Sequence, residues 1–438
     1  MGNKMLHKLV LLVTMLAIAS AIASSAPVRM QLMHTDAGRG LTPRELLHRM
    51  AQRSRARAER LLSEGASVPV TPGKLDASGA PDTEYLAHFA IGTPAQPVQL
   101  TLDSGSDLIW TQCQRCISCF NQSLPVFNAS LSSTIAELPC GSAACQDLPA
   151  TSCSAGNSSS TNNQLCVYSY SYGDGSVTIG ALVADTFVFG DGSAVPDMAF
   201  GCGLNNTGIF KSNETGIAGF GRGPLSLPSQ LKVDNFSYCF TNITGSTPSS
   251  VLLGLPANLH SSSARGIVQT TRLIQNPTIP TLYYLSLKGI TVGSTMLPIP
   301  ESTFALTNNG TGGTIIDSGT GMTTFPPDVY NLVHDAFIAQ TRLRVLNATM
   351  TPLCFKLPAG TKPDVPKLIL HFDGATLDLP RDNYMFEVED EGVPITCLAV
   401  LPGDAMTTIG NYQQQNMHII YDLANNMLSF VPAQCDEI

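Results

Sequence analysis

The chain has 438 residues, of which 24 are Lys or Arg and 33 are Asp or Glu, so only 13% of its residues are charged. This length is enough for two or three domains with a sizeable core. The low charge density and the abundance of Gly, Thr, Ser and Val exclude a coiled coil and a disordered chain, and they favour a β-rich globular protein.

The first 23 residues have the organisation of a secretory signal peptide. Lys4 and Lys8 precede an apolar run from Leu9 to Ile22, and Ala21-Ile22-Ala23 offers a small-residue cleavage site. The apolar run is shorter than the roughly 20 residues that a membrane-spanning helix needs. We therefore predict a secreted protein whose mature form has no stable membrane anchor, with the extracellular space as its destination and a vacuole as the alternative.

Residues 24–80 are predicted to be a prosegment and linker. Residues 24–62 carry eight arginines and three acidic residues, whereas residues 81–438 carry 13 basic and 28 acidic residues. Opposite charges would hold the basic segment on the acidic body, and acid would weaken that attraction. The segment has no aromatic side chains between its arginines, so nucleic acid is not an expected partner.

Within the prosegment, residues 42–62 are expected to form a helix. Thr42-Pro43 followed by Glu45 is a helix start signal, and apolar residues recur on one face among the arginines. The Gly/Pro/Ser-rich stretch that follows, residues 63–82, is typical of a linker that proteases trim.

After Glu84 the chain consists mainly of short apolar runs separated by turn residues, which predicts strands. Tyr85–Ile91 alternates and ends at Gly92-Thr93-Pro94, and Val98–Leu102 is a second strand. The best helical pattern runs from Asp328 to Thr341. We therefore expect a mainly β protein.

An internal repeat divides this β region in two. Leu100-Thr-Leu-Asp-Ser-Gly-Ser106 matches Thr314-Ile-Ile-Asp-Ser-Gly-Thr320, and an apolar-Gly element follows each copy, at residues 217–219 and 408–410. Repetition indicates one structural unit used twice. We place an N-terminal lobe at residues 81–262 and a C-terminal lobe at residues 263–438.

Both copies of the repeat place a carboxylate at the end of an apolar strand. Asp103 and Asp317 are each followed by Ser-Gly and then by Ser106 or Thr320. Gly allows the backbone to turn its N–H groups toward the carboxylate, and the hydroxyl can donate a further hydrogen bond. One such motif alone is most often an ordinary turn, whereas two at strand ends indicate a pair of functional acids.

These residues carry a specific resemblance. Asp103–Trp110 and Ile316–Thr320 resemble the two active-site signatures of pepsin-like aspartic proteases, and Tyr170–Ser176 resembles the flap hairpin of that family. Asp-Gly is also a hairpin-turn signal in its own right. The prosegment, the cysteine-rich stretch 113–166 and Phe200-Gly-Cys-Gly203 are similar to the nepenthesin-type plant branch, so the resemblance covers essentially the whole chain.

The resemblance implies a bilobal acid-protease fold with two pseudo-symmetric β lobes and an active-site cleft between them. It implies a secreted aspartic endopeptidase, made as a zymogen, in which Asp103 and Asp317 activate water by general acid/base catalysis at acidic pH. No cofactor and no metal are needed. The expected partners are protein or peptide substrates and pepstatin-type inhibitors, and the expected state is a monomer.

The resemblance also assigns roles to the residues around the dyad. In each loop, a hydroxyl and a backbone N–H group are expected to bind the carboxylate, and a second hydroxyl is expected to brace the two loops. A tyrosine-bearing flap is expected to close over substrate and to be supported by the single tryptophan. These residues are Ser104, Gly105, Ser106, Ser318, Gly319 and Thr320 in the loops, and Tyr172, Gly173, Asp174, Gly175 and Trp110 at the flap.

The twelve cysteines fit an oxidising secretory route, and their even number allows all of them to pair. The C-x-x-C-x-x-C run would indicate zinc or an iron–sulfur cluster in a cytosolic protein, but secretion favours disulfides. The resemblance suggests Cys354–Cys397 and Cys202–Cys435, while the pairing of the others stays open. The others are Cys113, Cys116, Cys119, Cys140, Cys145, Cys153, Cys166 and Cys239.

Glycosylation is a further expectation for a secreted chain. Nine Asn-X-Ser/Thr sequences are candidate sites, and such sites are expected on surface loops. They are Asn121, Asn128, Asn157, Asn205, Asn213, Asn235, Asn242, Asn309 and Asn347.

Two alternative functions remain open. The first is a non-catalytic inhibitor or binding protein of the same fold, although such relatives typically lack part of the machinery that is intact here. The second is a glycosidase, which also uses two carboxylates but would explain neither the flap nor the paired loops. Gly219-x-Gly221-x-Gly223 is not a phosphate-binding loop, because no Lys follows at the required spacing.

Overall fold

The computed structural model describes residues 28–34, 42, 44–45, 50, 85–154, 164–210, 213–243, 247–254, 263–346, 353–358, 360, 362–390 and 392–438. The predicted signal peptide and linker lie outside the described residues, as do Asn157 and Asn347. The lobe boundary predicted between residues 262 and 263 lies at the end of residues 255–262, which are outside the described residues, and it stays a prediction.

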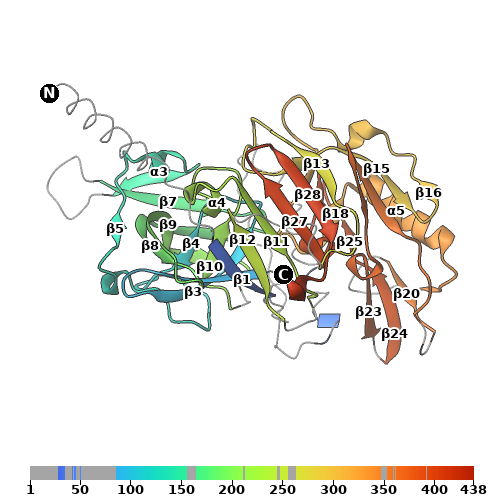
Figure 1. Cartoon of the computed structure of the whole chain (residues 1–438), viewed down its shortest axis with the longest axis horizontal. Coiled ribbons are helices and arrows are strands. Elements are labelled where there is room, and N and C mark those ends of the chain that lie inside the picture. Colours follow the sequence, from blue (N-terminus) through green and yellow to red (C-terminus); the bar gives the residue numbers. More distant parts are fainter. Residues whose placement is uncertain are drawn as a thin grey trace, which may run out of the picture.

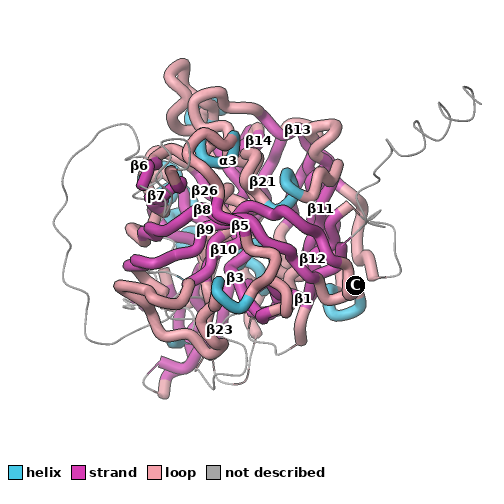
Figure 2. The backbone as a smooth tube through the Cα atoms, turned by 90° about the vertical axis from the view of Figure 1, so that its left-hand side faces the viewer, coloured by secondary structure: helices cyan, strands magenta, loops and turns pink. Residues whose placement is uncertain are grey.

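The fold is mainly β and has two halves, as the sequence predicts. Figure 1 shows the N-terminal half, in blue to green, beside the C-terminal half, in orange and red. One large sheet contains strands from both halves, and two four-stranded sheets lie in the C-terminal half. Figure 2 shows that the helices are few and short beside the strands.

In the N-terminal half, Arg44, Glu45 and Met50 are helical, and twelve strands and three short helices have both ends described. They are β1 (Val28–His34), β2 (Tyr85–Ile91), β3 (Gln96–Asp103), β4 (Trp110–Gln112), η2 (Ala129–Leu131), β5 (Ala136–Glu137), α3 (Ala143–Gln146), β6 (Thr151–Ser154), β7 (Leu165–Ser171), β8 (Val177–Val188), β9 (Ala194–Thr207), β10 (Gly216–Gly219), α4 (Leu227–Gln230), β11 (Asn235–Cys239) and β12 (Ser249–Leu253).

The described part of the C-terminal half contains the remaining strands and the longest helix. They are β13 (Gln269–Ile274), β14 (Tyr284–Leu285), β15 (Leu287–Val292), β16 (Thr295–Met296), η3 (Glu301–Phe304), β17 (Thr314–Ile316), β18 (Thr323–Phe325), α5 (Pro327–Gln340), β19 (Val345–Leu346), β20 (Cys354–Lys356), β21 (Leu368–Phe372), β22 (Ala375–Asp378), η4 (Arg381–Asn383), β23 (Met385–Asp390), β24 (Val393–Leu398), β25 (Val400–Pro402), β26 (Thr407–Ile409), η5 (Asn411–Gln414), β27 (Met417–Asp422), β28 (Met427–Pro432) and η6 (Cys435–Glu437).

The expected strands and helix form for the reasons that their patterns indicate. The predicted strand Tyr85–Ile91 is β2, and the second predicted strand lies within β3. In α5, Val329, Val333 and Phe337 recur at four-residue spacing and are buried on one face, and Pro327 occupies a position where its missing N–H costs nothing.

The internal repeat forms the same arrangement in each half. β3 pairs in parallel with β10 so that Asp103 lies opposite Gly219. β17 pairs in parallel with β26 so that Ile316, the residue before Asp317, lies opposite Ile409. The repeated unit predicted from the sequence is therefore two equivalent strand pairs, each ending at an aspartate.

The halves are joined by strands as well as by loops. β27 returns from the C-terminal half to pair with β11, in the register Asn235 to Asp422 through Cys239 to His418. Figure 1 shows β27 and β28, in red, between the two halves. A continuous backbone ladder thus connects the halves, which limits how far they can move independently.

β1 is an integral part of the large sheet. It pairs with β12 on one side and with β2 on the other. Its residues alternate, with Val28, Met30 and Leu32 fully buried and the residues between them exposed. The predicted prosegment therefore contributes apolar burial and two strand ladders, which its basic composition alone does not indicate.

All twelve cysteines form disulfides, and one expected pair was wrong. Cys354 bonds Cys397, as expected, because β20 and β24 place the two directly opposite one another. Cys202, however, bonds Cys113, and Cys435 bonds Cys239, which rejects a Cys202–Cys435 bridge. The remaining pairs are Cys116–Cys119, Cys140–Cys153 and Cys145–Cys166.

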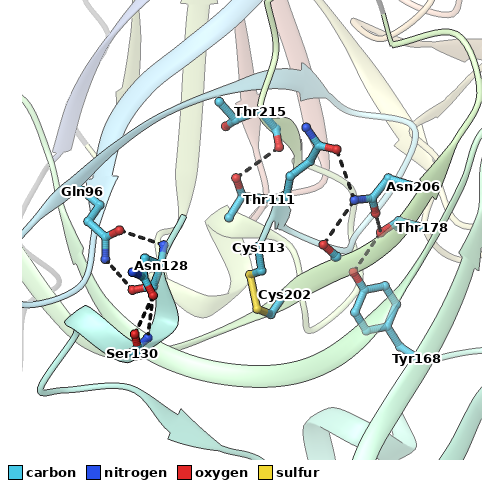
Figure 3. Close-up of a disulfide and its surroundings, with 12 residues drawn as sticks. Gln96, Thr111, Cys113, Asn128, Ser130, Tyr168, Thr178, Cys202, Asn206 and Thr215 are labelled. Atoms are coloured by element: carbon cyan, nitrogen blue, oxygen red, sulfur yellow. Dashed lines mark hydrogen bonds between the residues drawn. A yellow bond between two sulfur atoms is a disulfide. The ribbon is translucent and has the colours of Figure 1, made fainter. Parts of the chain in front are cut away.

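Strand register explains the correction. β4 runs parallel to β9 with Thr111 beside Cys202. Cys113 follows directly after β4, and its Cα atom lies 5.3 Å from the Cα atom of Cys202. Figure 3 shows this disulfide beside the hydrogen bonds Thr111–Thr215 and Thr178–Asn206. The disulfide between Cys239, at the end of β11, and Cys435 joins segments that are 196 residues apart in the sequence.

His418 makes the stability of this fold depend on pH. It is buried in β27, where its Nε2 lies 3.1 Å from the Ser237 hydroxyl, and burial lowers the pKa of its imidazole to about 4. In the unfolded chain the pKa is about 6.5. Between these values the unfolded chain binds a proton that the folded chain does not, so stability falls as pH falls from 6.5 to 4.

We expect His418→Gln to remove this dependence while keeping a hydrogen-bonding partner for Ser237. The loss of unfolding free energy between pH 7 and pH 4 should be smaller in the variant by up to about 3 kcal/mol. Urea unfolding of both proteins at the two pH values measures it. Equal pH dependence in wild type and variant would show that His418 does not contribute.

No helix among the residues described in the ranges given above is long and apolar enough to cross a membrane.

Candidate active site

The site is built where two equivalent loops follow β3 and β17. Both Asp103 and Asp317 are fully buried. The Gly105 N–H donates to Asp103 Oδ1 at 2.9 Å, and the Ser106 hydroxyl donates to Oδ2 at 2.5 Å. Each carboxyl group is thereby fixed in orientation by the turn that follows it.

The second loop repeats this arrangement atom for atom. The Gly319 N–H donates to Asp317 Oδ1 at 2.9 Å, and the Thr320 hydroxyl donates to Oδ2 at 2.6 Å. The loop residues singled out in the sequence therefore occupy the positions around the two carboxyl groups that their motifs predict.

Two serines lock the loops together. The Ser104 N–H donates to Ser318 Oγ and the Ser318 N–H donates to Ser104 Oγ, both at 2.9 Å. The Ser318 hydroxyl also donates to the Leu102 carbonyl oxygen at 3.0 Å. Because these residues adjoin the two aspartates, the crossed bonds hold carboxyl groups 214 positions apart in the sequence at one place in the fold.

The flap is a hairpin between β7 and β8. The Tyr172 N–H donates to the Ser176 carbonyl, and Gly175 adopts a φ of 93°, which glycine tolerates in a tight turn. Asp174 accepts from both the N–H and the hydroxyl of Ser176, so its carboxylate shapes the turn. Trp110 Nε1 donates to the Tyr172 hydroxyl at 2.7 Å, which is the contact expected between tryptophan and flap.

A cleft of about 920 Å³ is lined by the flap strand and by the loop that follows Asp103. Its walls come from the first aspartate loop at 105–108, the flap strand at 169–173, and segments 278–282 and 309–312. The cleft is lined by residues of both halves, and Gly105 and Ser106, which hydrogen-bond the Asp103 carboxyl group, are part of its wall, whereas Asp103 and Asp317 themselves are buried behind the lining. A cleft of this size can hold an extended chain beside a pair of acids.

Comparison with known proteins agrees with this geometry. The family models "Xylanase inhibitor N-terminal" and "Xylanase inhibitor C-terminal" match residues 85–255 and 282–432. Aspartic proteinase nepenthesin-1 of Nepenthes gracilis is 46% identical, over 93% of this chain and 90% of that protein. Aspartyl protease family protein 2 of Arabidopsis thaliana is 36% identical, over 93% and 85% of the two chains.

The chain belongs to the nepenthesin-type plant aspartic proteases.

Solved structures show the same fold at lower sequence similarity. The structure titled "Crystal structure of edgp" has a TM-score of 0.66 and 22% identity, over 83% of this chain and 95% of that one. Basic 7S globulin from soybean has a TM-score of 0.64 and 21% identity, over 83% and 97%.

A buried polar network beneath the dyad of this aspartic protease was missed by the sequence analysis. The Tyr238 hydroxyl donates to Gln414 Oε1 at 2.6 Å and lies 2.8 Å from the Tyr421 hydroxyl. Gln414 Nε2 in turn donates to the carbonyl oxygens of Asp317, at 3.2 Å, and Ile409. Burial raises the pKa of Tyr238 well above its usual value, so its hydroxyl keeps the proton that it donates.

The run Gln413-Gln414-Gln415 after the second apolar-Gly element was the available signal for this network. All three side chains are buried, and Asn411 Nδ2 also donates to the Ser318 carbonyl at 3.0 Å. Six consecutive amide or aromatic residues, 411–416, after a buried strand indicate a polar interior. Their partners include Tyr238 of β11, Thr323 of β18 and Asn383 of η4, which cannot be identified from local spacing.

The candidate glycosylation sites are less uniform than expected. Asn121, Asn213, Asn242 and Asn309 are exposed. Asn205 and Asn235 are only partly exposed and lie in strands β9 and β11, so the expectation of a surface loop was wrong for these two. The side chain of Asn128 accepts from Ser130 at the start of η2.

Proposed function

We propose that this protein is a secreted endopeptidase that hydrolyses peptide bonds in proteins at acidic pH, with Asp103 and Asp317 as its catalytic pair. The observation that carries the proposal is the crossed pair of Ser104–Ser318 hydrogen bonds, which holds together two loops with buried, identically bonded carboxyl groups, the first of which lines a cleft.

The chemistry follows from the dyad. Two adjacent buried carboxyl groups do not both ionise readily, so the pair works with one shared proton. The ionised member accepts a proton from a water molecule as it attacks the scissile carbonyl carbon. The protonated member donates a hydrogen bond to the carbonyl oxygen and later transfers its proton to the leaving amine, while the proton taken from water stays on the other carboxyl group.

The supporting residues have distinct parts in this reaction. Ser106 and Thr320, with the N–H groups of Gly105 and Gly319, orient the carboxyl groups. The Tyr172 flap closes over the bound peptide and excludes water, supported by Trp110.

A zymogen is also part of the proposal. The leader strand β1 occupies a place within the large sheet, and Met50 is fully buried in a cluster with Phe386 and Tyr412 of the C-terminal half. Thr42 and Glu45 exchange N-terminal capping bonds, which supports the helix predicted from residue 42. These contacts support a precursor whose leader folds with the body before proteolytic removal.

The second candidate function is a protein inhibitor or binding protein, which the description of the matching family models as xylanase inhibitor favours. The complete dyad and flap favour the peptidase, because a binding protein does not need two hydrogen-bonded aspartates under a cleft.

The test uses the purified full-length precursor. After incubation at about pH 3–4, we expect loss of the leader and cleavage of an unfolded protein substrate, and we expect pepstatin to block that cleavage. A folded, processed protein that cleaves nothing at any pH between 3 and 7 would overturn the proposal. Its binding to, and inhibition of, a xylanase would then support the second candidate.

A further inference from the structure

Asp107 is a third carboxyl group at the site, four residues after Asp103 and part of the wall of the cleft. Both of its carboxyl oxygens are engaged. The Gly223 N–H donates to Oδ1 at 2.8 Å, and the Thr281 hydroxyl donates to Oδ2 at 2.7 Å. Thr281 lies just before β14, so this carboxyl group connects the first aspartate loop to the chain that enters the C-terminal half.

The Gly219-x-Gly221-x-Gly223 motif forms a cradle for Asp107. A Cβ atom on Gly219 would collide with the Asp107 backbone, and one on Gly221 or Gly223 would collide with its carboxyl oxygens. The backbone of residues 219–223 must approach Asp107 closely, which explains why every second residue there is a glycine although the motif is not a phosphate-binding loop.

The cradle also holds the backbone of the catalytic loop. The Phe220 N–H donates to the Asp103 carbonyl at 2.7 Å, and the Gly221 N–H donates to the Ser106 carbonyl at 2.8 Å. On the opposite side, the Asp107 N–H donates to the hydroxyl of Tyr170 on the flap strand at 3.3 Å. Asp107 is thus the point at which the loop, the flap strand and the cradle meet.

We propose that Asp107 is a positioning residue for the dyad, whose carboxyl group, bound by Gly223 and Thr281, fixes the Asp103 loop against the cradle and the flap. This inference rests on the proposed peptidase function. Asp107 does not contact the scissile bond in this role and acts through the orientation of Asp103.

The contacts suit an enzyme that works in acid. Asp103 on its own loop, Tyr170 on the flap strand, and Arg222 and Tyr283 beside the cradle are the titratable or charged groups around it. Burial raises the pKa of Asp107, the hydrogen bonds from Thr281 and Gly223 oppose this rise, and the negative charge of Asp103 adds to it. A protonated Asp107 can donate to Thr281, which then accepts, so the connection survives at low pH.

The test compares Asp107→Ala with Asp107→Asn in the activated enzyme. Asp107→Ala should lower kcat about 30-fold with KM changed less than about threefold, because a misplaced catalytic group costs rate more than binding. Asp107→Asn keeps an acceptor for Gly223 and a group that can bond Thr281, so it should restore kcat to within about threefold of wild type. Asp185→Ala is the matched control and should leave kcat unchanged. Asp185 is likewise buried, in β8, and accepts a hydrogen bond from the Thr134 hydroxyl, but it lies outside the cleft.

A double-mutant cycle tests the cradle itself. Gly223→Ala alone should lower kcat by a factor similar to Asp107→Ala, but it should add almost nothing in the Asp107→Ala background, where its Cβ has room. Equal factors in both backgrounds, or an Asp107→Ala enzyme with wild-type kcat, would overturn the inference.

Hydrogen exchange of residues 103–110 gives a readout that does not need activity. Asp107→Ala should speed exchange in this segment at least about tenfold relative to wild type and to Asp185→Ala. If wild type proves inactive, the peptidase proposal fails, and this measurement still decides whether Asp107 holds the loop. Unchanged exchange would reject the positioning role.

Discussion

Replacing Asp103 with Asn should lower kcat for peptide-bond hydrolysis by about 10³-fold or more, because an amide cannot accept the proton of the attacking water. The fold should survive the change. The Asn side chain keeps an oxygen that accepts the Gly105 N–H, and its NH₂ group can donate to the Ser106 hydroxyl, which accepts as well as donates.

The measurement is the initial rate on a peptide substrate near pH 3.5, together with thermal unfolding to confirm the fold. Asp317→Asn should behave like Asp103→Asn, because its bonds to Gly319 and Thr320 are equivalent. Asp185→Asn, the same change at a buried aspartate outside the site, should keep the wild-type rate. A rate for Asp103→Asn within tenfold of wild type would contradict the dyad mechanism.

Replacing Met30 with Asp in the leader strand should destabilise the whole precursor. Met30 is fully buried at the centre of β1, opposite Val251 of β12. An aspartate there loses the apolar burial of the methionine and buries a carboxyl group, which together cost about 4 kcal/mol or more. Since domains are stable by about 5–15 kcal/mol, a large part of the secreted yield should be lost.

Gln31→Asp is the matched control, because the neighbouring side chain points to the exposed face of the same strand. Urea unfolding of the purified precursors compares the two changes, and secreted yield compares them if Met30→Asp cannot be purified. The control should unfold within about 1 kcal/mol of wild type. Equal effects of the two substitutions would show that β1 is not held in the sheet as described.

Local pattern predicted much of this fold. Short apolar runs bounded by turn residues identified β2 and β3, and the helical pattern from Asp328 to Thr341 identified α5, because these signals depend on neighbours in the chain. Asp-Gly with the preceding tyrosine likewise predicted the flap turn, where Gly175 takes a positive φ. The repeated Asp-Ser-Gly motif predicted which carboxyl groups lie together, since equivalent motifs form equivalent loops.

Pairing across long distances was beyond local pattern. Cys202 bonds Cys113 and not Cys435 because β4 lies beside β9, and that register depends on how the entire sheet assembles. The position of β1 within the sheet could not be predicted from local pattern either. Its alternation indicates a half-buried strand, but it does not indicate that β12 and β2 are the neighbouring strands.

By itself, then, the sequence determined the two Asp-Ser-Gly motifs, the flap, the mainly β class and the two-fold repetition, all of which depend on short segments of the chain. Only the tertiary structure decided the disulfide partners, the Tyr238–Gln414 network and the glycine cradle around Asp107. The physical reason is that a hydrogen bond, a disulfide or a close approach needs two partners, and here the partners are far apart in the sequence, by 89 residues for Cys113 and Cys202 and by 176 for Tyr238 and Gln414.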